Sequence, residues 1–328
     1  MALTTIESSA TDAVRGRVAR SIEGRRVDVK GRLFEAALVL CLLVSLAILA
    51  LLLADVIGDG WSVYPRRGQN FLQNGLSQNP VKAGIAQGLI GSFWIAVTVV
   101  VVALPLGVGA AIYLEEYAPR NRLTSFIEVN VRNLAGVPSV VYGLLGLAVF
   151  VEVFNGFTSA DGVGRRTLLA AGLTLAVLVL PIMIITTAEA IRAVPQALRE
   201  GAYGVGATRW EVIRTQVLPY ALPGILTGAL LSIARAVGEA APLILVGALT
   251  GLAGRSPGLS VGSLLDPSSL TERFTAMPNV ITTWAKLPKA EFNTTDTAAA
   301  IIGMLVFVLL VNSIAIVLRN RFEKKRSS

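Results

Sequence analysis

Two charged residues stand inside a long apolar stretch. Arg235 and Glu239 lie four residues apart between Leu231 and Leu245, a spacing that places both side chains on one face of a helix. An arginine near the middle of a bilayer costs about 2.5–3.5 kcal/mol, so such residues must face a protein interior or a wet cavity. A guanidinium can hold two oxygens of an oxyanion, and a neighbouring carboxylate can orient it. The pair predicts either a polar point on an anion path or a structural ion pair between helices.

A second apolar run carries polar residues near its start. Pro138, Ser139 and Tyr142 lie within the run from Asn133 to Val151. A helix that begins at Ser139 could direct backbone N–H donors toward an anion. The alternative is an ordinary first helical turn with proline near its first position. We include Ser139 and Tyr142 with Arg235 and Glu239 as candidates for a polar path.

Several kinds of chemistry are excluded by composition. The chain has no histidine and one cysteine, Cys41, which lies in an apolar run. This excludes catalytic triads, Cys–His pairs, and histidine or thiolate metal clusters. No G-x-x-x-x-G-K-[ST] loop is present to cradle nucleotide phosphates. We therefore expect no catalytic residue, no metal and no cofactor bound by this chain.

The composition is that of an integral membrane protein. Of 328 residues, 54% are hydrophobic and 15% are charged, and the mean hydropathy is +0.67. Such values indicate a chain that lies among membrane lipids. The net charge of +8 comes from basic residues concentrated at both ends and in the turns. Membrane orientation explains that distribution better than binding to nucleic acid, which we do not expect.

The polar and apolar stretches alternate in a way that predicts six membrane helices. They are expected at residues 36–54, 89–114, 133–151, 167–188, 220–249 and 297–318, each long enough to cross about 30 Å of hydrocarbon. We divide the chain into a basic arm (1–32), a first helix (33–57), an external loop (58–84), a transmembrane domain (85–318) and a basic tail (319–328). A second long external loop is expected over residues 250–296.

The basic residues are distributed unequally between the two sides. Eighteen lysines and arginines lie in the arm, the turn after the second helix, the region 192–214 and the tail, against nine on the other side. The excess predicts that both termini and the segment 195–219 are cytoplasmic.

The segment 195–219, named here the coupling segment, is too polar for hydrocarbon. Five charged residues fall within 199–214, so it must lie in water or against another protein. It reads as two short helices, one ending near Tyr203 and one starting near Thr208, with Gly204 and Gly206 permitting the turn. Thr208 and Glu211 have the spacing of a capping box.

One side of the second short helix is expected to be apolar. Trp210, Ile213 and Val217 recur at spacings of three and four residues, which places them on one face. An apolar face outside the membrane requires a partner.

The coupling segment resembles the cytoplasmic loop of ABC importer permeases, whose pattern is E-A-A, three residues, G, nine residues, I, one residue, L-P. The matching residues are Glu200, Ala202, Gly206, Leu218 and Pro219. Gly201 and Gln216 depart from the pattern. The resemblance implies that the segment docks into a groove of an ATPase subunit; the alternative is a charged surface loop that connects two spans.

Other stretches narrow the resemblance to the PstA-type permeases of phosphate importers. Residues 91–147 and 225–243 resemble that family, although Ala240 replaces the usual threonine. The resemblance implies an all-α polytopic fold of six helices with the type I (MetI-like) permease core, and Arg235 and Glu239 on the phosphate path. It also implies a PstC-like permease partner, a homodimeric ATPase that binds ATP and magnesium, and an external phosphate-binding protein.

Other functions remain as alternatives. Rival substrates are sulfate and molybdate, and the chain could be the PstC-like partner itself. A secondary transporter would ordinarily show inverted repeats, and an intramembrane enzyme would need paired acids or a histidine. Gly224 and Gly228 form a GxxxG pair, which predicts close helix packing within the chain or with a partner.

Overall fold

A computed structural model describes residues 29–154, 157, 166–248, 266–271 and 273–327, which are helical wherever they form regular structure. The chain divides into two units, 1–55 and 56–328. Helix α2 (Val29–Gly60) begins in the first unit. All its residues up to Asp55 are exposed in the isolated chain, and its hydropathy is that of a membrane span. Most of the predicted basic arm, residues 1–28, lies outside the described residues.

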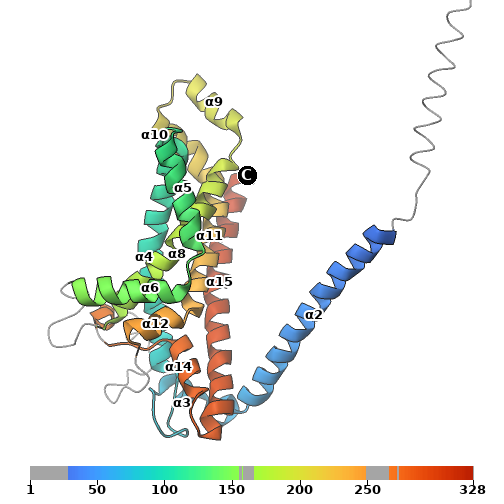
Figure 1. Ribbon diagram of the computed structural model, residues 1–328, viewed down its shortest axis with the longest axis vertical. Helices are drawn as coiled ribbons and strands as arrows, with labels where there is room; N and C mark the ends of the chain where they lie inside the picture. Colours follow the sequence, from blue (N-terminus) through green and yellow to red (C-terminus); the bar gives the residue numbers. More distant parts are fainter. Residues whose placement is uncertain (1–28, 155–156, 158–165, 249–265, 272, 328) are drawn as a thin grey trace, which may run out of the picture. The chain divides into compact units, whose positions relative to one another are not determined.

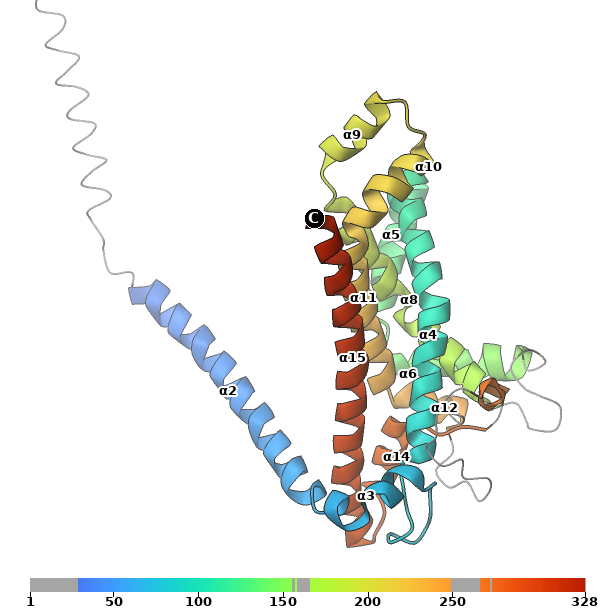
Figure 2. The same ribbon diagram turned by 180° about the vertical axis from the view of Figure 1, so that it is seen from behind.

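The second unit is a helical bundle with further short helices at both ends (Figures 1 and 2). Its α-helices are α3 (Val63–Gln73), α4 (Ala86–Ile112), α5 (Arg122–Ala135), α6 (Ser139–Gly146), α8 (Leu168–Arg192), α9 (Gln196–Gly204), α10 (Arg209–Val212), α11 (Leu218–Gly238), α12 (Ala241–Val246), α14 (Met277–Trp284) and α15 (Thr297–Ser327). Its π-helical turns are η1 (Tyr113–Tyr117), η2 (Leu147–Val153), η3 (Ile213–Val217) and η5 (Glu291–Asp296), and η4 (Pro267–Thr271) is a 3-10 turn.

The spans agree with a six-helix membrane fold. Five helical stretches are long and apolar enough to cross a bilayer: Val29–Gly60, Ala86–Tyr117, Leu168–Arg192, Arg209–Gly238 and Glu291–Arg321. The bent pair of Arg122–Ala135 and Ser139–Val153 brings the number to six if it counts as one span.

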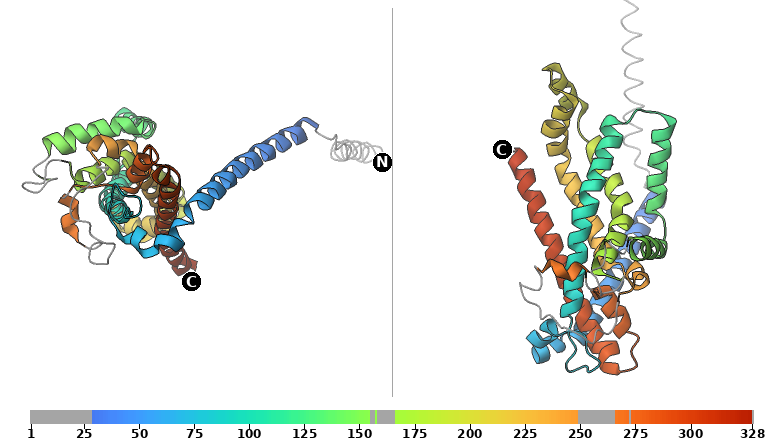
Figure 3. Two further views of the ribbon diagram at one scale, coloured as in Figure 1. Left: turned by 90° about the horizontal axis from the view of Figure 1, so that it is seen from below. Right: turned by 90° about the vertical axis from the view of Figure 1, so that its left-hand side faces the viewer.

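The third predicted span, residues 133–151, is broken near its start. α5 and α6 meet at 101°, and α6 lies crosswise to the bundle (Figures 1 and 3). Pro138 stands at the break with extended ψ of 137°. Proline has no N–H to donate and disfavours helical geometry in the residue before it. The hydrophobic run therefore continues while the helix does not.

The predicted fifth span is also broken. α11 ends at Gly238, and Glu239 adopts an extended conformation with ψ of 120° before α12 begins. By contrast, α8 continues through Pro181. The two helix breaks, after Ala135 and after Gly238, lie close in sequence to the polar residues Tyr142, Arg235 and Glu239.

α8 is the central helix of the bundle. In its most apolar stretch 67% of the residues are buried, against 39% in Ala86–Tyr117 and 33% in Arg209–Gly238. Small residues allow the neighbouring helices to approach it closely. A Cβ atom on Gly224 would lie 2.7 Å from the Ala190 Cβ, and one on Gly228 would collide with the Thr186 side chain. The GxxxG pair of α11 thus packs against α8 within the chain.

A second core, named here the outer core, closes the end of the bundle opposite the coupling segment and contains residues of α3, α14 and η5. Phe71, Trp284 and Phe292 are buried there, with ring centroids 6.3 Å and 5.4 Å apart in succession. Arg67 of α3 pairs with the buried Asp296 of η5. The stretches that the sequence presented as external loops therefore contain the packed elements α3, η4, α14 and η5. Residues 250–265 and 272 of the second predicted loop lie outside the described residues.

Candidate substrate path and coupling segment

Arg235 and Glu239 meet at the break that ends α11. The Arg235 Nε and Glu239 Oε1 atoms are 3.5 Å apart, and the two side chains are 44% and 21% exposed. Arg235 lies in the last turn of α11, where a cation is favoured by the helix dipole, and Glu239 lies just beyond that helix. The expectation that both residues belong to one continuous helix was wrong, although the ion pair itself is present.

Tyr142 lies at the other break, beside the same pair. Its hydroxyl donates a hydrogen bond of 2.8 Å to the Leu134 carbonyl across the bend between α5 and α6. Arg235 is close enough to interact electrostatically with the Tyr142 hydroxyl. A Cβ on Gly143 would lie 2.8 Å from the Pro242 Cα, which shows how closely α6 and α12 pack. The two broken helices therefore meet at the polar residues.

Ser139 occupies the first position of α6, directly after Pro138. Its side chain is partly buried. Within the described ranges it makes no hydrogen bond or ion pair with Arg235, Glu239 or Tyr142. The structure thus brings together three of the four predicted path residues and leaves Ser139 at the start of the same short helix.

The coupling segment lies at the end of the bundle opposite α3 and α14 (Figure 2). Gly206 has φ of +86°, in the left-handed region that favours glycine, and forms the turn between α9 and α10. Gly204 ends α9 and has no positive φ. Thr208 and Glu211 form the predicted capping box, in which the Thr208 N–H donates to the Glu211 carboxylate at 2.7 Å.

The faces of the second short helix differ from the prediction. Ile213 and Val217 are fully buried against the bundle, whereas Trp210 is 53% exposed. Ile213 and Val217 open and close the π-helical turn η3, whereas Trp210 lies before it in the single turn of α10. Trp210 therefore joins exposed Tyr203 and Val205 on the outer surface.

The remaining residues of the permease pattern have distinct places. Glu200 is exposed on α9 and Ala202 is partly buried. Leu218 begins α11 and packs against the cluster beneath the coupling segment. Pro219 lies at the start of α11, directly after η3, and it donates no backbone hydrogen bond to the preceding turn.

The end of α4 holds residues that sequence reasoning missed. Glu116 is only 8% exposed and pairs with Arg199 at 3.0 Å. Glu115 pairs with Arg192 at 2.6 Å. The sequence did contain a sign of these pairs. Two adjacent acids follow a span in the run Leu114–Pro119, and arginines occur in the later polar segment.

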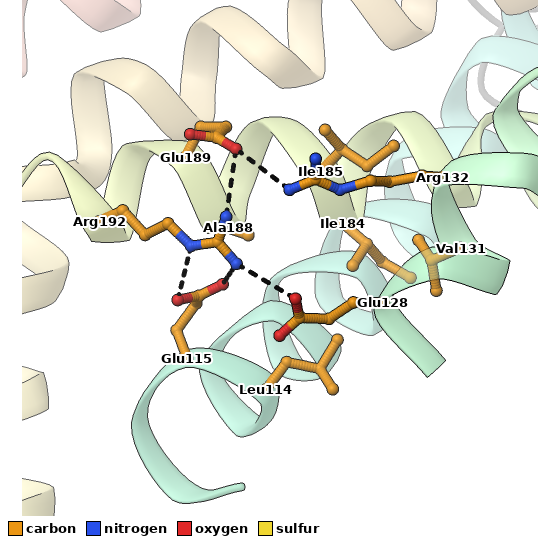
Figure 4. A pocket seen from close by; sticks show the side chains of 10 residues that line it. All are labelled: Leu114, Glu115, Glu128, Val131, Arg132, Ile184, Ile185, Ala188, Glu189 and Arg192. Carbon is orange, nitrogen blue, oxygen red and sulfur yellow. Dashed lines mark hydrogen bonds and ion pairs between the residues drawn. The ribbon is translucent and has the colours of Figure 1, made fainter. Parts of the chain in front are cut away.

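Arg192 is the centre of an ion-pair cluster that joins three helices (Figure 4). It contacts Glu115 of η1, Glu128 of α5 at 3.7 Å and Glu189 of α8 at 3.4 Å. Arg132 of α5 lies 3.8 Å from Glu189. Because these side chains are mostly half-exposed, the cluster contributes modestly to stability.

The structure thus defines a membrane-spanning helical bundle with a polar point at two helix breaks and a folded polar segment outside the span. Residues 103–328 match the family model described as the binding-protein-dependent transport system inner membrane component. The chain belongs to this family. It is a multi-pass inner-membrane permease component of an ABC importer, a component that is not itself catalytic.

Individual relatives of this chain also carry the names of transport permeases. The probable ABC transporter permease protein YqgI of Bacillus subtilis is 36% identical over 211 residues, 64% of this chain and 68% of the relative. The phosphate transport system permease protein PstA of Mycobacterium leprae is 36% identical over 238 residues, 71% of this chain and 74% of the relative. The protein named PstC in Haemophilus influenzae is 32% identical over 287 residues, 82% of this chain and 85% of the relative.

Solved structures share the fold. A bacterial alginate ABC transporter, in complex with an alginate pentasaccharide-bound periplasmic protein, has a TM-score of 0.57 at 16% identity, over 88% of this chain and 94% of the other. The methionine transporter MetNI, in an inward-facing conformation, has a TM-score of 0.50 at 17% identity, over 73% of this chain and 94% of the other. At these identities the likeness concerns the fold alone.

Proposed function

We propose that this chain is the PstA-like permease subunit of an ATP-driven importer that carries inorganic phosphate across the cytoplasmic membrane. The observation that carries the proposal is the state of Arg235. Within the described residues its one ion-pair contact is with Glu239, through Nε, and its side chain is 44% exposed. Both terminal nitrogens thus remain available to two oxygens of a phosphate. Relatives named as phosphate transport permeases support the choice of substrate.

The neighbouring groups suit transient binding of an anion. Glu239 orients the guanidinium and opposes a bound anion, which keeps the site from becoming a trap too deep to release its substrate. Tyr142 holds the bend at which α6 begins, and Ser139 starts that helix, where N–H groups lack intrahelical partners. In this proposal phosphate passes Arg235 and Glu239 first, with Ser139 and Tyr142 lining the same passage.

The coupling segment provides the link to ATP. We place it and both termini in the cytoplasm on the strength of the lysine and arginine excess. Exposed Glu200, Tyr203, Val205 and Trp210 present a mixed apolar and acidic surface, which suits docking to one subunit of an ATPase homodimer that binds ATP and magnesium. A PstC-like permease completes the passage, and an external phosphate-binding protein delivers the substrate to the α3 and α14 end.

Transport in this scheme is a change between two states of the bundle. ATP binding closes the ATPase dimer, the coupling segments of the two permeases move with it, and the passage opens outward. Hydrolysis then resets the inward state. By linkage, a ligand that stabilises the outward state also binds that state more tightly than the inward state.

The test is uptake of radiolabelled phosphate in cells that lack this chain and in cells in which it is restored. Uptake that depends on the chain and resists excess sulfate and molybdate is the expected result. Uptake inhibited by sulfate or molybdate would assign the permease to that oxyanion. Phosphate uptake that is indifferent to the chain would remove phosphate as the substrate.

A PstC-like role is the second candidate, because a relative named PstC aligns with 82% of this chain. Complementation separates the two roles. Restoration of phosphate uptake in a strain that lacks only its PstA-type subunit supports our proposal. Restoration only in a strain that lacks its PstC-type subunit would reverse the assignment.

A further inference from the structure

Three consecutive residues of η1, the turn that follows α4, each contact a different arginine. The three arginines lie between the end of α8 and the start of α10. The contacts join Glu115 to Arg192, Glu116 to Arg199, and the Tyr117 ring to Arg209. Arg192 ends α8, Arg199 lies in α9 and Arg209 begins α10. One short turn thus contacts the coupling segment at both of its helices and at the helix that leads into it.

The geometry of η1 makes this arrangement possible. Residues Tyr113–Tyr117 form a π-helical turn, closed by a hydrogen bond of 2.8 Å from the Ala118 N–H to the Tyr113 carbonyl. Consecutive side chains on a helical turn point in different directions, so each of the three reaches a different neighbour. Isolated π turns within α-helices occur frequently at functional sites.

The middle contact is the most enclosed of the three. Arg199 and Glu116 are 14% and 8% exposed and lie 3.0 Å apart. Arg199 also donates hydrogen bonds of 2.9 Å and 2.8 Å to the carbonyls of Ile191, in the last turn of α8, and Val194, just beyond that helix. Both terminal nitrogens of this guanidinium are therefore held by η1 and the end of α8, and a shift of α9 would displace these contacts.

Chain connectivity shows why the contacts matter. The coupling segment is joined covalently to α8 at one end and to α11 at the other. α4 is not adjacent to it in the chain, and the three contacts of η1 join the two beside an apolar cluster that brings Ala111 of α4 together with Val212 and Val217. A displacement of α9 and α10 therefore reaches α4 through Glu116 and Tyr117, in addition to the packing of α4 on α8 inside the bundle.

We propose that η1 is the point at which movement of the coupling segment is passed to α4, with Glu116 as the principal positioning residue and Tyr117 as the second. The inference rests on the proposed function in one respect, which is that the coupling segment docks on the ATPase. It goes beyond that function because it assigns a transmission role to residues outside the permease pattern and outside the substrate path.

The experiment uses the complete transporter, reconstituted with its partner subunits in liposomes together with the binding protein. Phosphate uptake and ATP hydrolysis are measured on the same preparation, and their ratio is the readout. Glu116→Gln is expected to assemble and hydrolyse ATP while uptake per ATP falls about tenfold. The conservative variant Glu116→Asp keeps the carboxylate that faces Arg199 and is expected to retain most of the ratio. Arg120→Gln, at an exposed arginine of the turn after η1 and outside the coupling segment, is the control and should leave the ratio unchanged.

A second pair of variants guards against misfolding of Glu116→Gln. Tyr117→Phe keeps the aromatic ring on which the Arg209 guanidinium lies, 5.1 Å from the centroid, and should behave as the unmodified protein. Tyr117→Leu removes the ring and should lower uptake per ATP about threefold. Equal ratios for Phe and Leu, or an unchanged ratio in an assembled Glu116→Gln complex, would overturn the inference.

The same measurements separate this inference from the proposed function. If the unmodified complex fails to transport phosphate, the substrate assignment is wrong. If it transports phosphate and all η1 variants remain fully coupled, the substrate assignment stands and the role of η1 is wrong.

Discussion

At the scale of single residues, the main question is whether Arg235 contacts the substrate or only forms a structural ion pair with Glu239. Its contact with Glu239 is long, at 3.5 Å, and both side chains are partly exposed. A structural pair that pinned two helices would be expected to be shorter and better enclosed, as Arg199 and Glu116 are. The comparison within one molecule favours the substrate role for Arg235.

Arg235→Gln is therefore expected to reduce phosphate uptake strongly without loss of assembly. Hydrogen bonds to charged groups contribute about 1.5–3 kcal/mol, so uptake at limiting phosphate should fall roughly 10- to 100-fold. Arg235→Lys keeps the charge but loses the planar fork and should give an intermediate rate. Uptake and recovery of the complex by affinity purification are measured together. Loss of the complex in both variants would instead support a structural pair.

Glu200 tests the docking surface. It is exposed on α9 and has no ion-pair partner in the described part of the chain, so its charge is free for another subunit. Glu200→Lys reverses that charge and is expected to leave membrane insertion intact while ATP hydrolysis no longer supports uptake. Glu200→Gln should give a smaller loss. Normal uptake by the lysine variant would show that this residue does not contribute to docking.

At the scale of elements, helix positions were predictable but helix breaks were not. Long apolar runs mark the spans because only apolar side chains are stable in the hydrocarbon of a bilayer. The Thr208 capping box could be predicted because its residues are close in sequence. At Pro138 and Glu239 the chain changes direction within apolar sequence, where hydropathy carries no signal. The proline did mark one of these points, although its effect on the whole span was underestimated.

Contacts distant in sequence explain the rest of what was missed. Glu116 and Arg199 are 83 residues apart, and nothing in the local pattern of either one indicates the other. Trp210, Ile213 and Val217 were predicted to share one face, whereas Trp210 is exposed and the other two are buried against the bundle. Ion pairs between distant residues and π-helical turns both depend on how helices pack together. A single sequence does not show that packing.

The pairing of Arg67 with Asp296 links α3 to η5 in the outer core. The Asp296 side chain is 2% exposed and that of Arg67 is 18% exposed. Removing one partner of a buried pair costs about 3–5 kcal/mol, whereas replacing both with apolar residues can be neutral or stabilising. Asp296→Asn should therefore lower the thermal unfolding temperature in detergent by several degrees, and Arg67→Met with Asp296→Leu should restore it.

Arg66 supplies the control for this element. It is the exposed neighbour of Arg67, so Arg66→Met should leave the unfolding temperature within about a degree, as most surface substitutions do. If Asp296→Asn were equally silent, the pair would not stabilise the outer core.

At the scale of the whole molecule, the second unit has two chemically different ends. The outer core of α3, α14 and η5 lies at one end and the coupling segment at the other (Figure 2). Permease function requires these ends to face opposite sides of the membrane, since ATP is available on only one. The lysine and arginine distribution predicts that the coupling segment faces the cytoplasm.

Cysteine labelling tests this orientation directly, because Cys41 is the single native cysteine and can be replaced by alanine. Gln78 at the outer core is exposed, and Val205 in the coupling segment is 85% exposed. A membrane-impermeant maleimide applied to spheroplasts should label Gln78→Cys at once and Val205→Cys only after the membrane is opened. The opposite pattern would place the coupling segment outside, where no ATPase could dock. Both the coupling scheme and the role of η1 would then fail together, whereas the assignment of Arg235 to the substrate path would survive, because a polar site between the two ends does not depend on which end faces the cytoplasm.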